Sequence, residues 1–496
     1  MQTDLKRLFR HSGVYLVGNL FNRLGAFLLL PVYTGYLSVD EYGRLELLYS
    51  LSAVISVICS AGLAHSTLRF YFDRKLERDR HRAIATGLTV VTVSICIGAA
   101  AVYMVRAPVA SWLLDDAAYA TAISLTLAIL VLELTTEVGF AFLRAREQSV
   151  FFVLLSVTRL LVQVALSFYL VVARGDGMLG VLQANLISIF VVWTIVIGYT
   201  VRHCGVGVDT TLLPAMLRYS APLALGSVVA SLIASIDRFL LKELLSLDAV
   251  GLYGLAMKFA VLLVFLVVEP FTRGYGPFRF SIMDQPNAPQ IQAQAAHYMF
   301  VLAVVAGVGV AMVTPETLIL MAAPAYFSAH YLVPLLAVGM VVGGLGYCYE
   351  TGILYRKRTS MLLYVNLAVL ALKTLANVAL IPLLGTIGAA LAFIVGQVTY
   401  AGLVLRVSQR LHPIPYQLAP LLRVLFLGVV AYSASLLIDY RVVWWSLPIK
   451  LSWFLVFCLA VCRFDPHSRA LVGGWLAGRG GPTFRRFARA CLPGEK

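Results

Sequence analysis

Ten ionisable side chains lie inside long apolar stretches of this 496-residue sequence. A charge in lipid is costly, so such residues usually face a cavity or an opposite charge and mark the path of a substrate or ion. The motifs of P-loop nucleotide binding (GxxxxGK(S/T)), zinc proteolysis (HExxH) and nucleophile-elbow hydrolysis (GxSxG) are absent. The sequence therefore favours binding and charge compensation over an enzyme. The ten residues are Arg23, Glu133, Glu137, Arg159, Asp237, Arg238, Lys258, Glu269, Glu350 and Lys373.

Two basic residues, Arg23 and Lys373, sit near the middle of their apolar stretches and have no acidic residue one helical turn away. Arginine grips an oxyanion with forked hydrogen bonds, and lysine acts as a point charge. We expect both side chains to contact an anionic group of the substrate in a central cavity. The alternative is that each pairs with a carboxylate of another helix, such as Glu350 or Asp237.

A second pair of charges, Glu133 and Arg159, lies at similar depth on consecutive apolar stretches. The spacing predicts an ion pair, and a packing role within one lobe competes with a role of Arg159 in substrate binding. Glu137 shares a helix face with Glu133, so the two carboxylates are candidates for proton or cation coupling.

The adjacent residues Asp237 and Arg238 lie near the end of their stretch, where snorkelling and mutual pairing are cheap. Arg238 is a candidate for substrate binding and Asp237 for ion coupling.

The composition predicts an integral membrane protein. Hydrophobic residues make up 60% of the chain, charged residues 13%, and the mean hydropathy is +0.87. Apolar runs such as 83–105 and 181–201 are long enough to cross a hydrocarbon core of about 30 Å as a helix. We therefore expect an all-α fold of about 14 transmembrane helices. The expected spans are 12–36, 46–68, 83–105, 117–143, 149–173, 178–201, 214–241, 249–272, 296–314, 331–354, 360–383, 386–405, 417–438 and 442–462.

An internal repeat organises these spans. One shift along the chain aligns Ser38 with Ser246 and Gly180 with Gly388. Each copy holds six spans, so both copies enter the membrane in the same orientation, as in transporters that rock two lobes around a central site. The predicted organisation is an N-lobe at 1–201 (helices 1–6), a linker at 202–213, a C-lobe at 214–410 (helices 7–12), helices 13–14 at 411–463 and a basic tail at 464–496.

The net charge of +15 has an explanation that needs no nucleic acid. Basic residues concentrate in the N-terminal segment, the even-numbered gaps between spans and the tail. This is the positive-inside pattern, and it predicts that both termini are cytoplasmic. The basic residues expected on the opposite side are Arg44, Arg106, Arg174, Lys242, Arg441 and Lys450.

The C-terminal tail interleaves arginines with Trp475, Phe484 and Phe487. Such a segment favours anionic lipid headgroups, with a partner-binding tail as the alternative. The first span is too long for a cleavable signal peptide and is followed by many more spans. The seven cysteines form no CxxC, so we expect no disulfide, no metal site and no cofactor.

Three short motifs carry a family resemblance. The segment from Leu30 to Gly43, the pair Gly62-Leu63 with its following Leu68-Arg69-Phe70-Tyr71, and the Gly385-Thr386-Ile387-Gly388 loop resemble bacterial polysaccharide flippases of the Wzx type. These belong to the multidrug/oligosaccharidyl-lipid/polysaccharide exporter superfamily. The resemblance implies alternating-access transfer of an undecaprenyl-pyrophosphate-linked oligosaccharide from the inner to the outer leaflet of the bacterial cytoplasmic (inner) membrane, in concert with polysaccharide polymerase machinery. Related lipid II flippases carry a functional arginine in the first helix, in the region that Arg23 occupies, whereas no family motif covers Lys373.

Two other functions compete with this interpretation. One is a cation-coupled multidrug exporter of the same fold. The other is a membrane-embedded polysaccharide polymerase, which typically exposes a large extracytoplasmic loop with paired Arg or His residues. Here the loops expected on that side are short, apart from 314–330.

Overall fold

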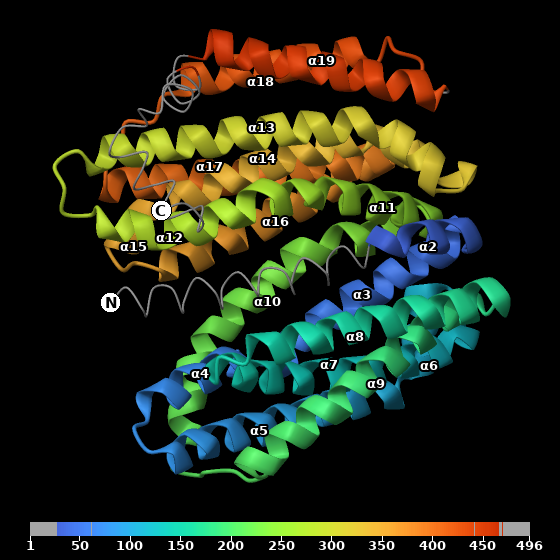
Figure 1. Cartoon of the computed structure of the whole chain (residues 1–496), viewed down its shortest axis with the longest axis vertical. Coiled ribbons are helices and arrows are strands. Elements are labelled where there is room, and N and C mark those ends of the chain that lie inside the picture. The colour runs from blue at the N-terminus through green and yellow to red at the C-terminus, as the bar shows by residue number, and fades with distance from the viewer. Residues whose placement is uncertain (1–26, 61, 441, 466–468, 470–496) are drawn as a thin grey trace. The chain divides into compact units, whose positions relative to one another are not determined.

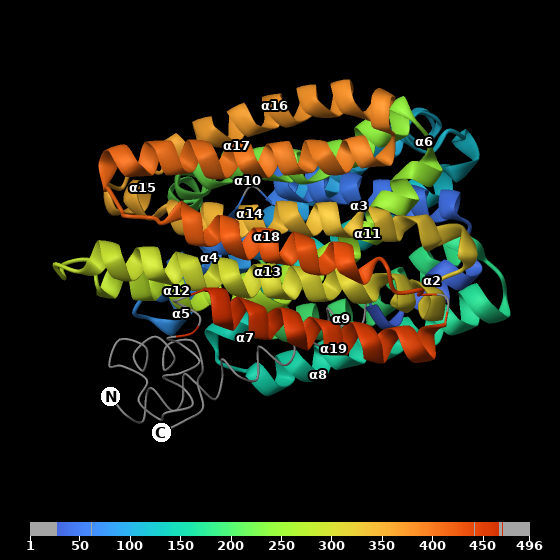
Figure 2. The ribbon, with the colours of Figure 1, turned by 90° about the horizontal axis from the view of Figure 1, so that it is seen from above.

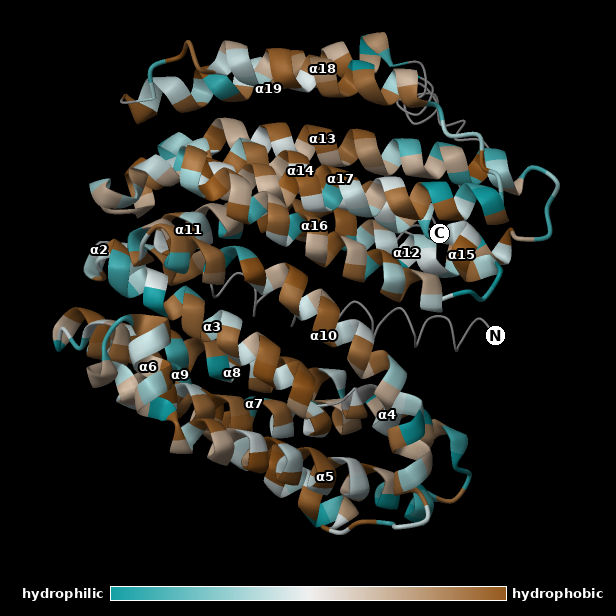
Figure 3. Ribbon diagram, turned by 180° about the vertical axis from the view of Figure 1, so that it is seen from behind, coloured by the Kyte–Doolittle hydropathy of each residue, from teal (hydrophilic) through white to brown (hydrophobic). Residues whose placement is uncertain are grey.

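The structure is a computed structural model that describes residues 27–60, 62–440, 442–465 and 469. All regular secondary structure in these residues is helical. Thirteen of the described helices are long and apolar enough to cross a membrane. They match the expected second to fourteenth spans, and they confirm an all-α membrane protein of about 14 transmembrane helices. Figure 3 shows the hydrophobic residues spread along these helices. Of the first expected span, the structure describes residues 27–36, which include α2 (Leu30–Tyr36).

The chain divides into two compact units, Met1–Lys242 and Glu243–Lys496. The first unit includes nearly all of α10 (Leu213–Leu244), the helix expected to open the C-lobe. An ion pair between Arg238 and Glu46 ties α10 to an earlier helix of this unit. Compactness does not test the internal repeat, so the lobe boundaries drawn from it stay predictions.

The first unit is a helical bundle in which α5, α7, α8 and α9 run side by side (Figure 1). Its helices besides α2 and α10 are α3 (Val39–Ser60), α4 (Leu63–Asp73), α5 (Glu77–Met104), α6 (Arg106–Leu114), α7 (Ala120–Ala145), α8 (Ser149–Ser167) and α9 (Gly177–Cys204), with the 3₁₀ turn η1 (Ala117–Tyr119) and the π-helical η2 (Phe168–Ala173).

The second expected span is divided in the structure. We expected one helix over 46–68, but α3 begins earlier, because Ser38 and Glu41 form a reciprocal capping box. The backbone N–H of Glu41 donates to Ser38 Oγ and that of Ser38 to Glu41 Oε2, both at 3.1 Å. A second helix, α4, starts after Gly62, which has a left-handed φ of 68°. A side chain at Gly62 would meet the backbone oxygen of Ser220 at 3.3 Å, so glycine suits the break on both counts.

The connection between α9 and α10 is ordered by hydrogen bonds. Asp209 accepts from the backbone N–H of Thr211 at 3.0 Å and from its hydroxyl at 2.6 Å. These bonds, the hydroxyl bond first, lower the pKa of the Asp209 carboxyl. The backbone N–H of Asp209 donates to Thr86 of α5 at 2.9 Å, which anchors the connection to the bundle.

The second unit is also a helical bundle. Its helices are α11 (Leu247–Leu263), α12 (Glu269–Ser281), α13 (Ala288–Met321), α14 (Val333–Tyr349), α15 (Thr351–Tyr355), α16 (Ser360–Leu384), α17 (Thr386–Leu411), α18 (Leu418–Ser435) and α19 (Val443–Phe464), with the π-helical η3 (Val264–Val268) joining α11 to α12 and the 3₁₀ helix η4 (Pro324–Tyr331). The expected loop at 314–330 is wrong in its first part, because α13 continues to Met321 through Pro315. Lys450 lies inside α19 rather than in a gap.

Candidate functional site

The predicted pair of Glu133 and Arg159 forms in the structure. The Arg159 guanidinium (Nη2) donates to Glu133 Oε1 at 2.5 Å and to Asn185 Oδ1 at 3.2 Å. The three residues come from α7, α8 and α9, so one basic side chain joins three consecutive helices. The side chains of Arg159 and Glu133 are 27% and 39% exposed, so the pair remains within reach of solvent or a ligand. Glu137 is exposed one turn further along α7.

Polar and apolar features adjoin this pair. The Trp193 indole donates to Thr135 Oγ1 at 2.8 Å, which adds a polar tie between α9 and α7. An apolar groove of about 500 Å³ runs along the same two helices, and its lining includes the direct chain neighbours of Glu133 and Asn185. The groove is lined by Ala128, Val131, Leu132, Leu186, Ile187 and Phe190.

Arg238 lies in a second charged group of the first unit. Its Nε is 3.2 Å from Glu46 Oε2, and the two side chains are 16% and 6% exposed. Asp237 is 1% exposed on the same helix. The sequence analysis did not single out Glu46, although a carboxylate enclosed by Leu45, Leu47 and Leu48 is a readable signal of a buried charge.

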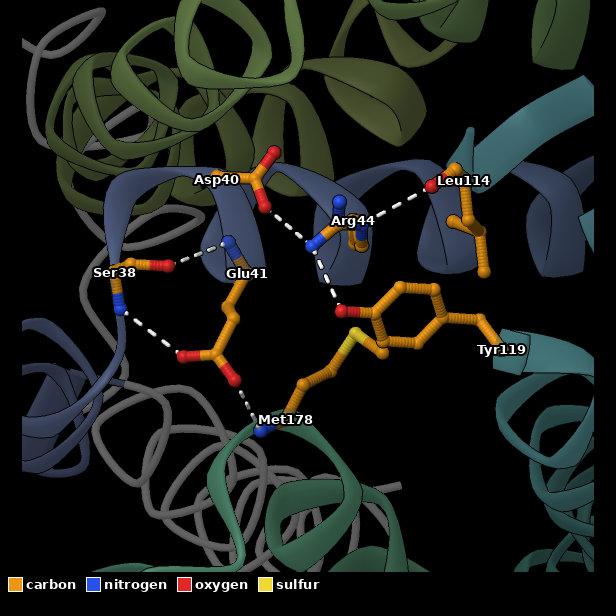
Figure 4. A network of polar contacts seen from close by, with 7 residues as sticks. All are labelled: Ser38, Asp40, Glu41, Arg44, Leu114, Tyr119 and Met178. Carbon is orange, nitrogen blue, oxygen red and sulfur yellow. Dashed lines mark hydrogen bonds and ion pairs between the residues drawn. The ribbon is translucent and has the colours of Figure 1, made fainter. Parts of the chain in front are cut away.

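A further network lies at the start of α3 and includes charged residues of the 30–43 segment, which we call the hairpin motif (Figure 4). Arg44 pairs with Asp40 and donates to the backbone oxygen of Leu114 at 3.1 Å and to the Tyr119 hydroxyl at 3.0 Å. Glu41 accepts from the backbone N–H of Met178 at 3.4 Å. Arg44, the residue after the motif, therefore ties α3 to the end of α6 and to η1, and Glu41 of the motif ties α3 to the start of α9.

Lys373 lies in the second unit, on α16, and is 2% exposed. Its ammonium is 5.3 Å from the centre of the Phe393 ring on α17, within the range of a cation–π interaction. Its alkyl chain runs over Gly396, where a Cβ would come within 3.1 Å of Lys373 Cδ. Asn377 donates to the backbone oxygen of Lys373 at 3.0 Å. The lysine is thus enclosed between two helices of one unit.

The structure brings some of the predicted site residues into contact. It joins Glu133 with Arg159, and it joins Arg238 with Glu46, all within the first unit. Arg23 and the C-terminal tail beyond Arg469 lie outside the described residues, so their roles stay predictions. Among the residues described, no group of three or more His, Cys, Asp or Glu side chains is placed to hold a metal ion.

Three comparisons with known proteins bear on this arrangement. Residues 8–282 match the family model described as "Polysaccharide biosynthesis protein". No curated protein sequence matches the chain. The fold is similar to that of "Lipid II flippase MurJ, inward closed conformation", with a TM-score of 0.72 and 11% identity over 90% of this chain and 98% of that one. It is also similar to an inward-facing "multidrug resistance MATE family transporter of the MOP superfamily", with a TM-score of 0.61 and 16% identity over 78% of this chain and 94% of that one.

Proposed function

Because the chain belongs to the polysaccharide biosynthesis protein family, whose model matches residues 8–282, we propose that it is a flippase for lipid-linked oligosaccharides. It moves an undecaprenyl-pyrophosphate-linked oligosaccharide from the inner to the outer leaflet of a bacterial cytoplasmic membrane by alternating access. The family match is the observation that carries this proposal. The hairpin motif at 30–43 and the fold shared with flippases and exporters support it.

The charges of the substrate define what its site must supply. A pyrophosphate cannot enter a low-dielectric region without compensation, because an isolated buried anion is prohibitively costly. Arg23, Arg159, Arg238 and Lys373 are the proposed compensating cations. Of the three that the structure describes, Arg159 is the most exposed, and it already holds an exchangeable anionic partner in Glu133.

The lipid part of the carrier needs an apolar surface. The groove between α7 and α9 offers one, and its lining includes Leu132, the chain neighbour of Glu133. Glu133, Glu137 and Asp237 are the proposed coupling carboxylates, since a proton or cation on Glu133 would release Arg159 for the substrate.

Reporter fusions test the proposed membrane topology. We place both termini in the cytoplasm, with the tail on anionic lipids of the inner leaflet. A fusion after Arg358 should report a cytoplasmic position and a fusion at Gly385 a periplasmic one. The opposite pattern would invert the direction of transport that we propose.

A leaflet assay tests the function. The purified protein is reconstituted into vesicles that contain fluorescent undecaprenyl-pyrophosphate oligosaccharide, and a membrane-impermeant quencher reports how much label reaches the outer leaflet. We expect the quenched fraction to rise above that of protein-free vesicles. An Arg23→Ala, Lys373→Ala double variant of normal folded yield should abolish the rise, whereas unchanged flipping would remove both residues from the site.

A multidrug exporter is the second candidate, and the similarity to the multidrug resistance transporter favours it. The same vesicles distinguish the two functions. Cation-driven dye transport without oligosaccharide flipping would replace our proposal with this one.

A further inference from the structure

The two helices outside the repeat, α18 and α19, pack against α13 of the second unit (Figure 2). They are also joined to each other, since the Trp453 indole of α19 donates to the backbone oxygen of Ala431 in α18 at 2.9 Å. Two buried contacts that the sequence did not predict hold this hairpin to α13, one an ion pair and the other a hydrogen-bonded histidine–aspartate pair.

The first ion pair joins Lys450 of α19 to Glu316 of α13. The Lys450 ammonium is 2.7 Å from Glu316 Oε1, and the two side chains are only 3% and 0% exposed. Lys450 also donates to the backbone oxygen of Met312 at 3.2 Å. Both ions are enclosed by protein, so neither has water as an alternative partner.

The second contact, a hydrogen-bonded histidine–aspartate pair, joins the other ends of the same helices. His297 Nε2 of α13 is 3.0 Å from Asp465, the residue that follows α19, and the side chains are 7% and 2% exposed. Along α13, His297 and Glu316 are separated by about 28 Å at 1.5 Å per residue. The two buried pairs are therefore independent contacts near opposite ends of one helix pair.

Helices α13 and α19 also approach each other closely between the two buried pairs. A Cβ at Gly309 of α13 would lie 3.2 Å from the Phe454 ring of α19, tighter than ordinary van der Waals contact. The absence of a side chain at Gly309 lets the aromatic ring pack against the helix backbone. The attachment therefore has three points of contact, polar at both ends and apolar in the middle.

The order of the charges specifies one register. Along α13 the groups are His297 and then Glu316, and antiparallel α19 presents Asp465 and Lys450 to them. A slide of α19 by one turn, about 5.4 Å, would separate both pairs at once. It would leave four buried ionisable groups without their partners, which a low-dielectric interior penalises heavily.

We propose that these two buried pairs form a two-ended clamp that locks the α18–α19 hairpin to α13 in a single register. The hairpin is then a fixed part of the second unit and keeps its place on α13 throughout the transport cycle. The statement about transport rests on the proposed flippase function, whereas the statement about register does not.

A double-mutant cycle tests the clamp without any transport assay. Glu316→Leu and Lys450→Met are made singly and together, and the apparent melting temperature is measured in detergent. Each single change should lower the melting temperature, and the double variant should recover more than half of the summed loss. Additive losses would overturn the clamp. The matched control is the Asp115–Lys242 pair, where Asp115 is 55% exposed and the same removal should change little.

A covalent lock tests the fixed position. Cysteines replace Gly309 and Phe454 in a chain freed of its seven native cysteines, and a short thiol cross-linker joins them. The cross-linked protein should flip lipid at the rate of the uncrosslinked protein within about twofold. A loss of flipping that appears only on cross-linking would overturn the fixed hairpin. Absence of flipping in the uncrosslinked protein as well would count against the proposed function, and the melting-temperature cycle would still decide the clamp.

Discussion

In each unit a basic side chain approaches the same position of the predicted repeat, but the surroundings of the two side chains differ. The shift that aligns Gly180 with Gly388 also aligns Asn185 of α9 with Phe393 of α17. In the first unit Asn185 and Glu133 receive Arg159 from α8. In the second unit Phe393 lies against Lys373 from α16.

The difference separates an exchangeable charge from an enclosed one. Arg159 is held by hydrogen bonds to acceptors and is 27% exposed, so another anion can compete for it. Lys373 is 2% exposed, its ammonium lies near the Phe393 ring, and its alkyl chain lies against Gly396. The Arg159 arrangement suits a site where a substrate anion replaces Glu133. The Lys373 arrangement suits a charge that becomes accessible to a substrate only when α16 and α17 move.

The largest effect on stability should come from the aromatic side of this comparison. Phe393 is 7% exposed, so Phe393→Ala should destabilise the protein by about 3 kcal/mol through the cavity and the lost cation–π contact. Phe393→Asn, which copies the first unit, should cost a similar amount. Thermal unfolding followed by size-exclusion chromatography measures both. Phe426→Ala, at a side chain 67% exposed, is the matched control, and an equal loss there would contradict the argument.

The next effect concerns transport. Lys373→Met keeps the length of the side chain and removes the charge, so the folded yield should stay close to normal. Flipping should fall at least about tenfold, equivalent to about 1.4 kcal/mol, if the charge serves the substrate. Lys373→Arg should keep part of the rate. A poor yield of the Met variant with normal flipping per folded molecule would assign the charge to packing instead.

A smaller effect is expected for the exchangeable pair. In a double-mutant cycle of Glu133→Gln and Arg159→Met, we expect a coupling of about 1 kcal/mol, reduced by the partial exposure of both groups. Thermal unfolding gives the four values that the cycle needs. A coupling near zero would mean that the pair contributes nothing to the bundle.

The smallest effect should come from the hairpin network of Figure 4, where the repeats also differ. In the predicted second repeat, Leu252 occupies the position of Arg44 and Ala249 that of Glu41, although Ser246 still caps its helix. Arg44→Leu should therefore be tolerated, with a loss of about 0.5 kcal/mol from the bonds to Leu114 and Tyr119. The control is Arg174→Leu, at an exposed surface pair, and a larger loss there would contradict the ranking.

Apolar length and depth account for what the sequence predicted well. Thirteen spans follow from long apolar runs, and Glu133 meets Arg159 because consecutive helices bring equal depths together. The sequence could not predict Glu46 as the partner of Arg238, because the two residues lie far apart in the chain and only tertiary packing joins them.

The structure differs from the sequence prediction at two places where a helix continues or breaks. The sequence predicts a loop at Glu316, because a charge beside Pro315 ends the apolar run there. The helix nevertheless continues through both residues. The break at Gly62 depends on a backbone angle that the residue permits but does not require.

The attachment of α19 limits how far the chain can be shortened. A version that ends after α17 retains the whole predicted repeat, yet it uncovers Glu316 and His297 on α13 to hydrocarbon. A minimal transporter built from the two six-helix lobes therefore needs apolar replacements at both positions before it can be stable in a bilayer. The last two helices thus cover two ionisable side chains of α13.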